Sequence, residues 1–149
     1  MTKKQWIITA AIILAIVTAL SLYYVPRIVG RTVNLPDGEP LLIKGFVSNE
    51  VKNPILDCKT EDAEEMAAFL VDLQSIEMRY VDRKNIYEVG KFSADVFIRY
   101  EDGGEFRIFL SENGAVRWND KNYKCTDPEA VKDLLARIQS WELYHESTP

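Results

Sequence analysis

The chain has 149 residues, a formal net charge of −5, two cysteines and one histidine. This length allows one domain with one modest core and leaves little room for a second domain. The residues after position 30 carry 15 basic and 23 acidic side chains, a net charge of −8, and the two signs are interleaved. Nucleic acids are bound through clustered Lys and Arg, so we expect no nucleic-acid partner.

An uncharged apolar segment opens the chain, running from Gln5 to Val25. At 1.5 Å per residue a helix of this length spans a hydrocarbon layer of roughly 30 Å. Trp6 at one end and Tyr23 with Tyr24 at the other are side chains that favour the membrane interface, and we expect the proline that follows to end the helix. The segment therefore predicts a transmembrane helix that anchors the protein.

Flanking charges predict the orientation of this segment. Lys3 and Lys4 favour a cytoplasmic location for residues 1–4, although Arg27 on the far side weakens the bias. We expect an uncleaved signal anchor in the cell membrane, with the rest of the chain outside the cytoplasm. The alternative is a signal peptide cleaved near Ser21, which would release a secreted protein.

The remainder divides by composition into three parts. Residues 26–40 are rich in Pro and Gly and predict a stalk, with a short strand at 31–35. Residues 41–145 predict one extracytoplasmic domain, and residues 146–149 a tail.

Two amphipathic helices are predicted within the domain. The first covers 61–76 with Thr60 as its N-cap, and the second covers 127–143 with Thr126 as its N-cap and Glu129 completing a capping box. Their apolar stripes are Met66, Phe69, Leu70, Leu73 and Ile76 in the first helix and Val131, Leu134, Leu135, Ile138 and Trp141 in the second. The stripes are 65 residues apart throughout, which leaves two interpretations open: an ancient duplication, or the chance likeness of two amphipathic helices.

Short strands fill the rest of the domain. Strands are predicted at 41–47, 78–81, 86–89, 94–100, 105–110, 115–118 and 122–125. The first of these is apolar enough to suggest burial on both faces. The predicted fold class is α+β, with both helices packed on one face of a twisted antiparallel sheet.

The other face of this sheet is the predicted interaction surface. If Val96, Ile98, Phe106 and Ile108 point to the core, their neighbours point away from it. Aromatic and arginine side chains are typical anchors of protein interfaces. The candidate contact residues are Phe97, Arg99, Arg107 and Phe109.

Cys58 and Cys125 form a candidate disulfide, because the count is even and an exported domain is exposed to oxidising conditions. The alternative is two separate buried thiols. Two cysteines without a Cys-x-x-Cys motif support neither a redox enzyme nor a zinc site. We expect no metal and no cofactor.

Candidate catalytic groups are few. His145, the single histidine, falls in the tail, which removes the commonest general base. Glu101, Asp102 and Glu105 cluster at a hairpin, where they are typical of turn chemistry. We therefore expect no catalytic activity.

The leading functional hypothesis is a membrane-anchored module that binds an envelope protein or a surface ligand. The first alternative is a small envelope enzyme that uses carboxylates such as Glu101 or Glu105. The second is a structural membrane protein that recruits partners through the small side chains of its membrane helix, Ala10, Ala11, Ala15 and Ala19.

Overall fold

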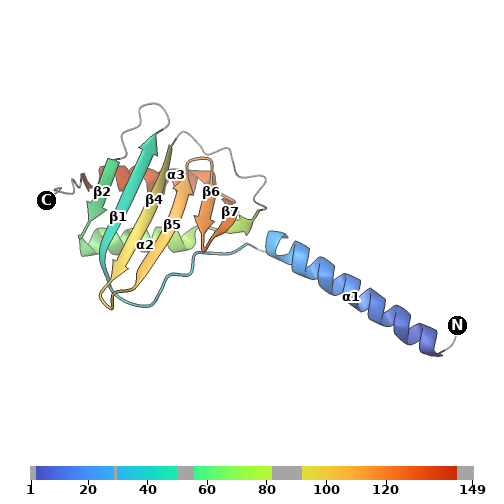
Figure 1. Ribbon diagram of the computed structural model, residues 1–149. Coiled ribbons are helices and arrows are strands. Elements are labelled where there is room, and N and C mark those ends of the chain that lie inside the picture. The colour runs from blue at the N-terminus through green and yellow to red at the C-terminus, as the bar shows by residue number, and fades with distance from the viewer. Residues whose placement is uncertain (1–2, 29, 50–55, 82–91, 144–149) are drawn as a thin grey trace.

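The computed structural model describes residues 3–28, 30–49, 56–81 and 92–143 (Figure 1). The N-terminal helix α1 (Lys3–Ile28) extends away from the rest of the chain and contains an apolar stretch, Gln5–Val25, long enough to cross a membrane. None of that stretch is buried against the described part of the domain. Such an apolar surface needs lipid or protein around it. The helix also continues two residues beyond Pro26, where we had expected it to end.

An antiparallel sheet of eight strands forms the body of the domain within the described residues. Its spatial order is β3-β7-β6-β5-β4-β1-β2-β8, and neighbouring strands pair antiparallel throughout. The α+β class is thus confirmed. The strands are β1 (Pro40–Asn49), β2 (Leu56–Thr60), β3 (Met78–Tyr80), β4 (Phe92–Tyr100), β5 (Glu105–Ser111), β6 (Ala115–Trp118), β7 (Lys121–Cys125) and β8 (Glu142–Leu143).

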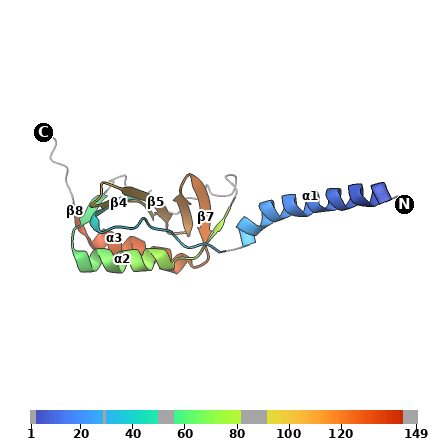
Figure 2. The same ribbon diagram turned by 90° about the horizontal axis from the view of Figure 1, so that it is seen from below.

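Two helices, α2 (Ala63–Ser75) and α3 (Pro128–Ser140), lie side by side along one side of this sheet (Figure 2). Their apolar stripes and the alternate residues of the strands form one buried cluster. Phe69 and Leu73 of α2 and Val131 and Ile138 of α3 are fully buried in it. Burying apolar area of this kind is the main favourable term in folding.

Each helix begins one or two residues later than the sequence suggested, because an aspartate caps it. Asp62 accepts a hydrogen bond from the backbone N–H of Glu65 at 2.8 Å, and Asp127 accepts one from that of Glu129 at 3.1 Å. Thr126 instead donates its hydroxyl to the carbonyl of Glu77 at 3.1 Å. The predicted threonine N-caps were therefore wrong, and aspartate fills the role that both residue types favour.

Two strands were missed. In β2 the strongly apolar residue, Leu56, is exposed, while Cys58 and Thr60 face the core, so its alternation is weak. The strand β8 was predicted as the last turn of the second helix. Its pairing of Glu142 with Lys59 of β2 shows that a tertiary contact decides its conformation.

The segment after α1 runs along the domain. Arg31 and Met78 exchange two backbone hydrogen bonds of 2.8 Å, so Arg31 extends the sheet beyond β3. Val33 is buried in the core, and the backbone N–H of Glu101 donates to the carbonyl of Glu39 at 3.1 Å. The predicted strand at 86–89, His145 and the tail at 146–149 lie outside the described residues.

Candidate functional site

The side of the sheet opposite α2 and α3 carries the predicted contact residues. Successive side chains of a strand point to opposite sides, and Val96, Ile98, Phe106 and Ile108 are all buried with the helices. We call the outward residues of the four central strands the open face. They are Leu42, Lys44 and Phe46 of β1, Asp95, Phe97 and Arg99 of β4, Glu105, Arg107 and Phe109 of β5, and Arg117 of β6.

An aromatic pair with a guanidinium above it forms the centre of the open face. The rings of Phe46 and Phe97 meet edge to face, with centroids 5.3 Å apart and planes at 88°. Arg107, directly opposite Phe97 in the register, places its Cζ 4.7 Å from the Phe97 ring centroid. Both geometries are favourable contacts between side chains that remain partly accessible.

Ion pairs hold two of the arginines in place. Arg107 donates through Nε to Oδ1 of Asp95 at 3.3 Å, and Arg99 lies 3.6 Å from Oε1 of Glu105. These side chains are largely exposed, so each pair contributes little to stability, about 0 to 1 kcal/mol. The pair with Asp95 is made by the same guanidinium that lies over the Phe97 ring.

Arg117 is held differently. It lies opposite Phe109 in the register, and its Cζ is 5.8 Å from the Phe109 ring centroid. Among the described residues, no ion pair involves Arg117. The next two residues after β6, Asn119 and Asp120, have φ of 49° and 56°, as the two-residue turn of a tight hairpin requires.

Two open hollows adjoin each other on this face. The first, about 280 Å³, is mainly apolar and is lined by Leu42, Lys44, Phe46, Phe97, Ile98, Arg99 and Glu105. The second, about 520 Å³, is more polar and is lined by Asp95, Glu105, Arg107, Phe109, Arg117, Trp118, Asn119 and Asp120. Glu105 lines both, so they form one composite surface.

Charge separates the two sides of the domain. The open face has four basic and two acidic side chains, a net charge of +2. The helices α2 and α3 with their capping aspartates carry seven acidic and two basic side chains, a net charge of −5. The open face is therefore a locally basic surface on an acidic domain.

Sequence reasoning missed the contribution of β1 to this face. Burial on both sides was predicted for 41–47, but only Ile43, Gly45 and Val47 are buried, whereas Leu42, Lys44 and Phe46 are partly accessible. The signal was present as a two-residue alternation. It was obscured because Leu42 and Phe46, on the outward side, are themselves apolar.

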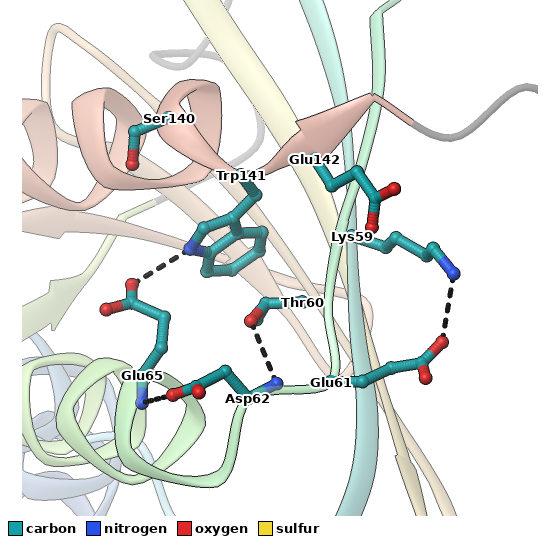
Figure 3. Close-up of a pocket in the computed structure, with 8 residues that line it drawn as sticks. All are labelled: Lys59, Thr60, Glu61, Asp62, Glu65, Ser140, Trp141 and Glu142. Atoms are coloured by element: carbon teal, nitrogen blue, oxygen red, sulfur yellow. Dashed lines mark hydrogen bonds and ion pairs between the residues drawn. The ribbon is translucent and has the colours of Figure 1, made fainter.

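A separate pocket lies where α2 begins and α3 ends, beside β2 and β8 (Figure 3). Three of the four carboxylates that line it, those of Glu61, Asp62 and Glu65, are engaged within the protein. Glu65 accepts a hydrogen bond from the indole N–H of Trp141 at 2.9 Å, Glu61 pairs with Lys59 at 3.0 Å, and Asp62 caps α2. The contact between Glu65 and Trp141 ties the first turn of α2 to the residue that follows α3.

The hairpin carboxylates also have structural roles. Asp102 accepts a hydrogen bond from the backbone N–H of Gly104 at 2.8 Å, which closes the turn between β4 and β5. Glu105 pairs with Arg99, and Glu101 is exposed in the turn. No group of three His, Cys, Asp or Glu side chains with metal-binding geometry occurs in the described ranges.

The predicted disulfide is wrong, because Cys58 and Cys125 are both free and buried. Cys58 lies in β2 and Cys125 in β7, and five strand-to-strand steps separate these two strands. At about 4.8 Å a step they are roughly 24 Å apart, far beyond the reach of a disulfide. Burial raises the pKa of both thiols above its ordinary value, with Asp57 adding to the effect at Cys58.

No protein-family model matches this chain, and no curated protein or solved structure is significantly similar to it.

Proposed function

We propose that this chain is a membrane-anchored, extracytoplasmic module without catalytic activity that binds a partner protein on its open face. The single observation that carries the proposal is the cluster of Phe46, Phe97 and Arg107 between two adjoining hollows. Aromatic and arginine side chains are the residues most often found to dominate binding energy at protein interfaces. Here they stand on three neighbouring strands, β1, β4 and β5, of a sheet whose other side is covered by helices.

The location rests on α1 and its flanking charges. An apolar helix with basic residues before it favours a cytoplasmic N-terminus and an external domain. Only three steps along the chain lead from Ile28, the last residue of α1, to Arg31, which is hydrogen-bonded to β3. Three residues span at most about 10 Å, so the domain would stand close to the membrane surface. A protein of the same membrane or envelope is accordingly the expected partner.

We also propose that the domain arose by internal duplication. The pair β2 and α2 and the pair β7 and α3 have the same lengths and are offset by 65 residues. The same offset places β5 on β1 and Leu143 of β8 on Met78 of β3. This correspondence supports two units that exchange their last strands, since β3 pairs with β7 and β8 pairs with β2.

Co-purification from native membranes tests the proposed function. The tagged full-length protein is extracted in mild detergent as wild type, as a Phe97→Ala/Arg107→Ala double variant and as Val71→Ala. Val71 is an exposed apolar residue of α2, on the other side of the domain, and serves as the matched control. We expect a near-stoichiometric protein with wild type and Val71→Ala, and at least about a tenfold lower yield of it with the double variant.

Circular dichroism establishes that all three proteins are folded. Equal recovery of the partner by the double variant, or recovery of no protein by the wild type, would contradict the proposal. Replacing residues 5–25 by an unrelated membrane helix separates it from recruitment through α1, because a module that binds through its open face keeps its partner.

A further inference from the structure

We infer that the open face binds an extended segment of the partner protein that carries one apolar side chain and, three or four residues away, one carboxylate. This inference rests on the proposed function and adds the chemistry that the partner must present. It follows from the two hollows, from Arg117, which has no ion pair with any residue that the structure describes, and from the distance between Phe97 and Arg117.

The first hollow suits an apolar side chain. The rings of Phe46 and Phe97 and the side chain of Leu42 form much of its lining, and the stems of Lys44 and Arg99 flank it. Long basic side chains can lay their methylene groups along an apolar surface while their charge stays in water. Its volume of about 280 Å³ exceeds that of one large aliphatic or aromatic side chain. A side chain bound there would remove the Phe46 and Phe97 rings from water, which is favourable.

The second hollow offers one guanidinium for a carboxylate. Arg107 is paired with Asp95 and Arg99 with Glu105, whereas Arg117 contacts the Phe109 ring and no described carboxylate at ion-pair distance. A guanidinium fixed against an aromatic ring presents its N–H groups in the planar fork that binds a carboxylate through two hydrogen bonds. Three carboxylates line the same hollow: Asp95 and Glu105 are paired with Arg107 and Arg99, and Asp120 lies in the turn after β6. An occupant must therefore bring its carboxylate to Arg117 on the side away from Asp120.

The register sets the distance between the two contacts. Phe97 in β4 and Arg117 in β6 are two strands apart and one row of side chains apart, since Phe97 pairs with Arg107 and Arg117 pairs with Phe109. With about 4.8 Å between strands and about 3.4 Å per residue along them, their Cα atoms lie roughly 12 Å apart. An extended chain covers that distance in three or four residues.

A protein segment fits these features better than a polyanion does. Polyanions bind through many unpaired cations, and their affinity grows with the number of charges neutralised. The open face has a net charge of only +2, two of its arginines are already paired, and its centre is aromatic. A protein segment with one carboxylate near one apolar side chain would contact both the aromatic hollow and Arg117.

Selection of random 12-residue peptides on phage tests the inference. The target is the full-length protein in lipid nanodiscs, as wild type, as Arg117→Glu and as Lys132→Glu. Lys132 is exposed on α3, so its variant makes the same change of net charge on the far side of the domain. We expect peptides selected on wild type to share an apolar residue and an Asp or Glu three or four positions apart.

Those peptides should bind Arg117→Glu at least about tenfold more weakly and Lys132→Glu as tightly as wild type. Selected peptides without an acidic residue, or with unchanged affinity for Arg117→Glu, would overturn the inference. A selection that yields no binding peptide, or an apolar and acidic pair at the seven-residue spacing of a helix, would overturn it as well. The proposed function stands or falls separately, on whether the Phe97→Ala/Arg107→Ala variant loses the co-purified protein.

Discussion

At the scale of single residues, the two cysteines show how position in the sheet decides their chemistry. Both precede a helix by a few residues, and that similarity made them look like partners. In the fold they occupy corresponding strands near opposite ends of the sheet, β2 and β7. Each thiol is buried, and Cys125 donates its S–H to the carbonyl of Asp127 at 3.1 Å.

We predict that Cys58 and Cys125 remain reduced and unreactive in the folded protein. A maleimide reagent should label neither thiol of the full-length protein in mild detergent at pH 8, and should label both after denaturation. Burial slows the reaction because it removes access and raises the pKa of each thiol. Failure of the denatured, unreduced protein to take up any label would reveal a disulfide and contradict the prediction.

The same pKa shifts predict a dependence of stability on pH. Above about pH 9, the ordinary pKa of these thiols, the unfolded chain releases protons that the folded chain keeps. The free energy of unfolding should therefore fall as pH rises from 9 towards the folded values. A Cys58→Ala/Cys125→Ala variant should lose less stability over this range than wild type, measured by urea unfolding.

At the scale of secondary structure, one strand and one helix meet closely at a glycine. A Cβ placed on Gly45 of β1 would lie 2.3 Å from Cγ2 of Ile138 in α3. Ile138 is fully buried and branched at Cβ, so it has little freedom to move aside. Glycine at this position lets α3 lie close against the sheet.

We predict that Gly45→Ala destabilises the domain by about 1 to 3 kcal/mol through overpacking. Urea unfolding followed by tryptophan fluorescence measures the change. In an Ile138→Ala background the same substitution should cost much less, because the clashing methyl group is gone. An equal loss of stability in the two backgrounds would show that the contact with Ile138 is not what excludes a larger residue at position 45.

Local periodicity and capping patterns predicted most helices and strands. They failed where a contact with a residue distant in the sequence determines the local conformation. The helix stripes and the four strands of the meander follow from periodicity alone. The strand β8 forms because its two residues pair with β2, although the sequence there continues the helical pattern. Thr126 does not cap α3 as expected, because its hydroxyl donates a hydrogen bond to the carbonyl of Glu77, 49 residues away.

The candidate site was predictable in part for the same reason. Alternation along β4 and β5 is strong enough to separate Phe97 and Arg107 from the core residues beside them. The order of strands in the sheet is not encoded in any one strand. Hence Phe46, which meets Phe97 only because β1 pairs with β4, and Arg117, which joins the face through β6, could not be assigned from the sequence.

At the scale of the whole molecule, the two sides of the domain differ in net charge, and helices cover only one side of the sheet. The side of α2 and α3 is acidic, and the open face is locally basic with exposed aromatic groups. The short strands β3 and β8 end the sheet, and Arg31 continues it at the β3 edge. Short or covered edges disfavour the addition of strands from other chains, which directs association to the faces.

Site-specific photo-crosslinking in intact cells tests the central claim most directly. The full-length protein carries p-benzoylphenylalanine in place of Arg99, which borders the apolar hollow, or in place of Val71 on the opposite side. Irradiation should join the first variant to one protein of defined mass and leave the second without that product. Crosslinking to the same protein from Val71 and not from Arg99, or no crosslinked protein from Arg99, would contradict the claim that the open face binds a partner.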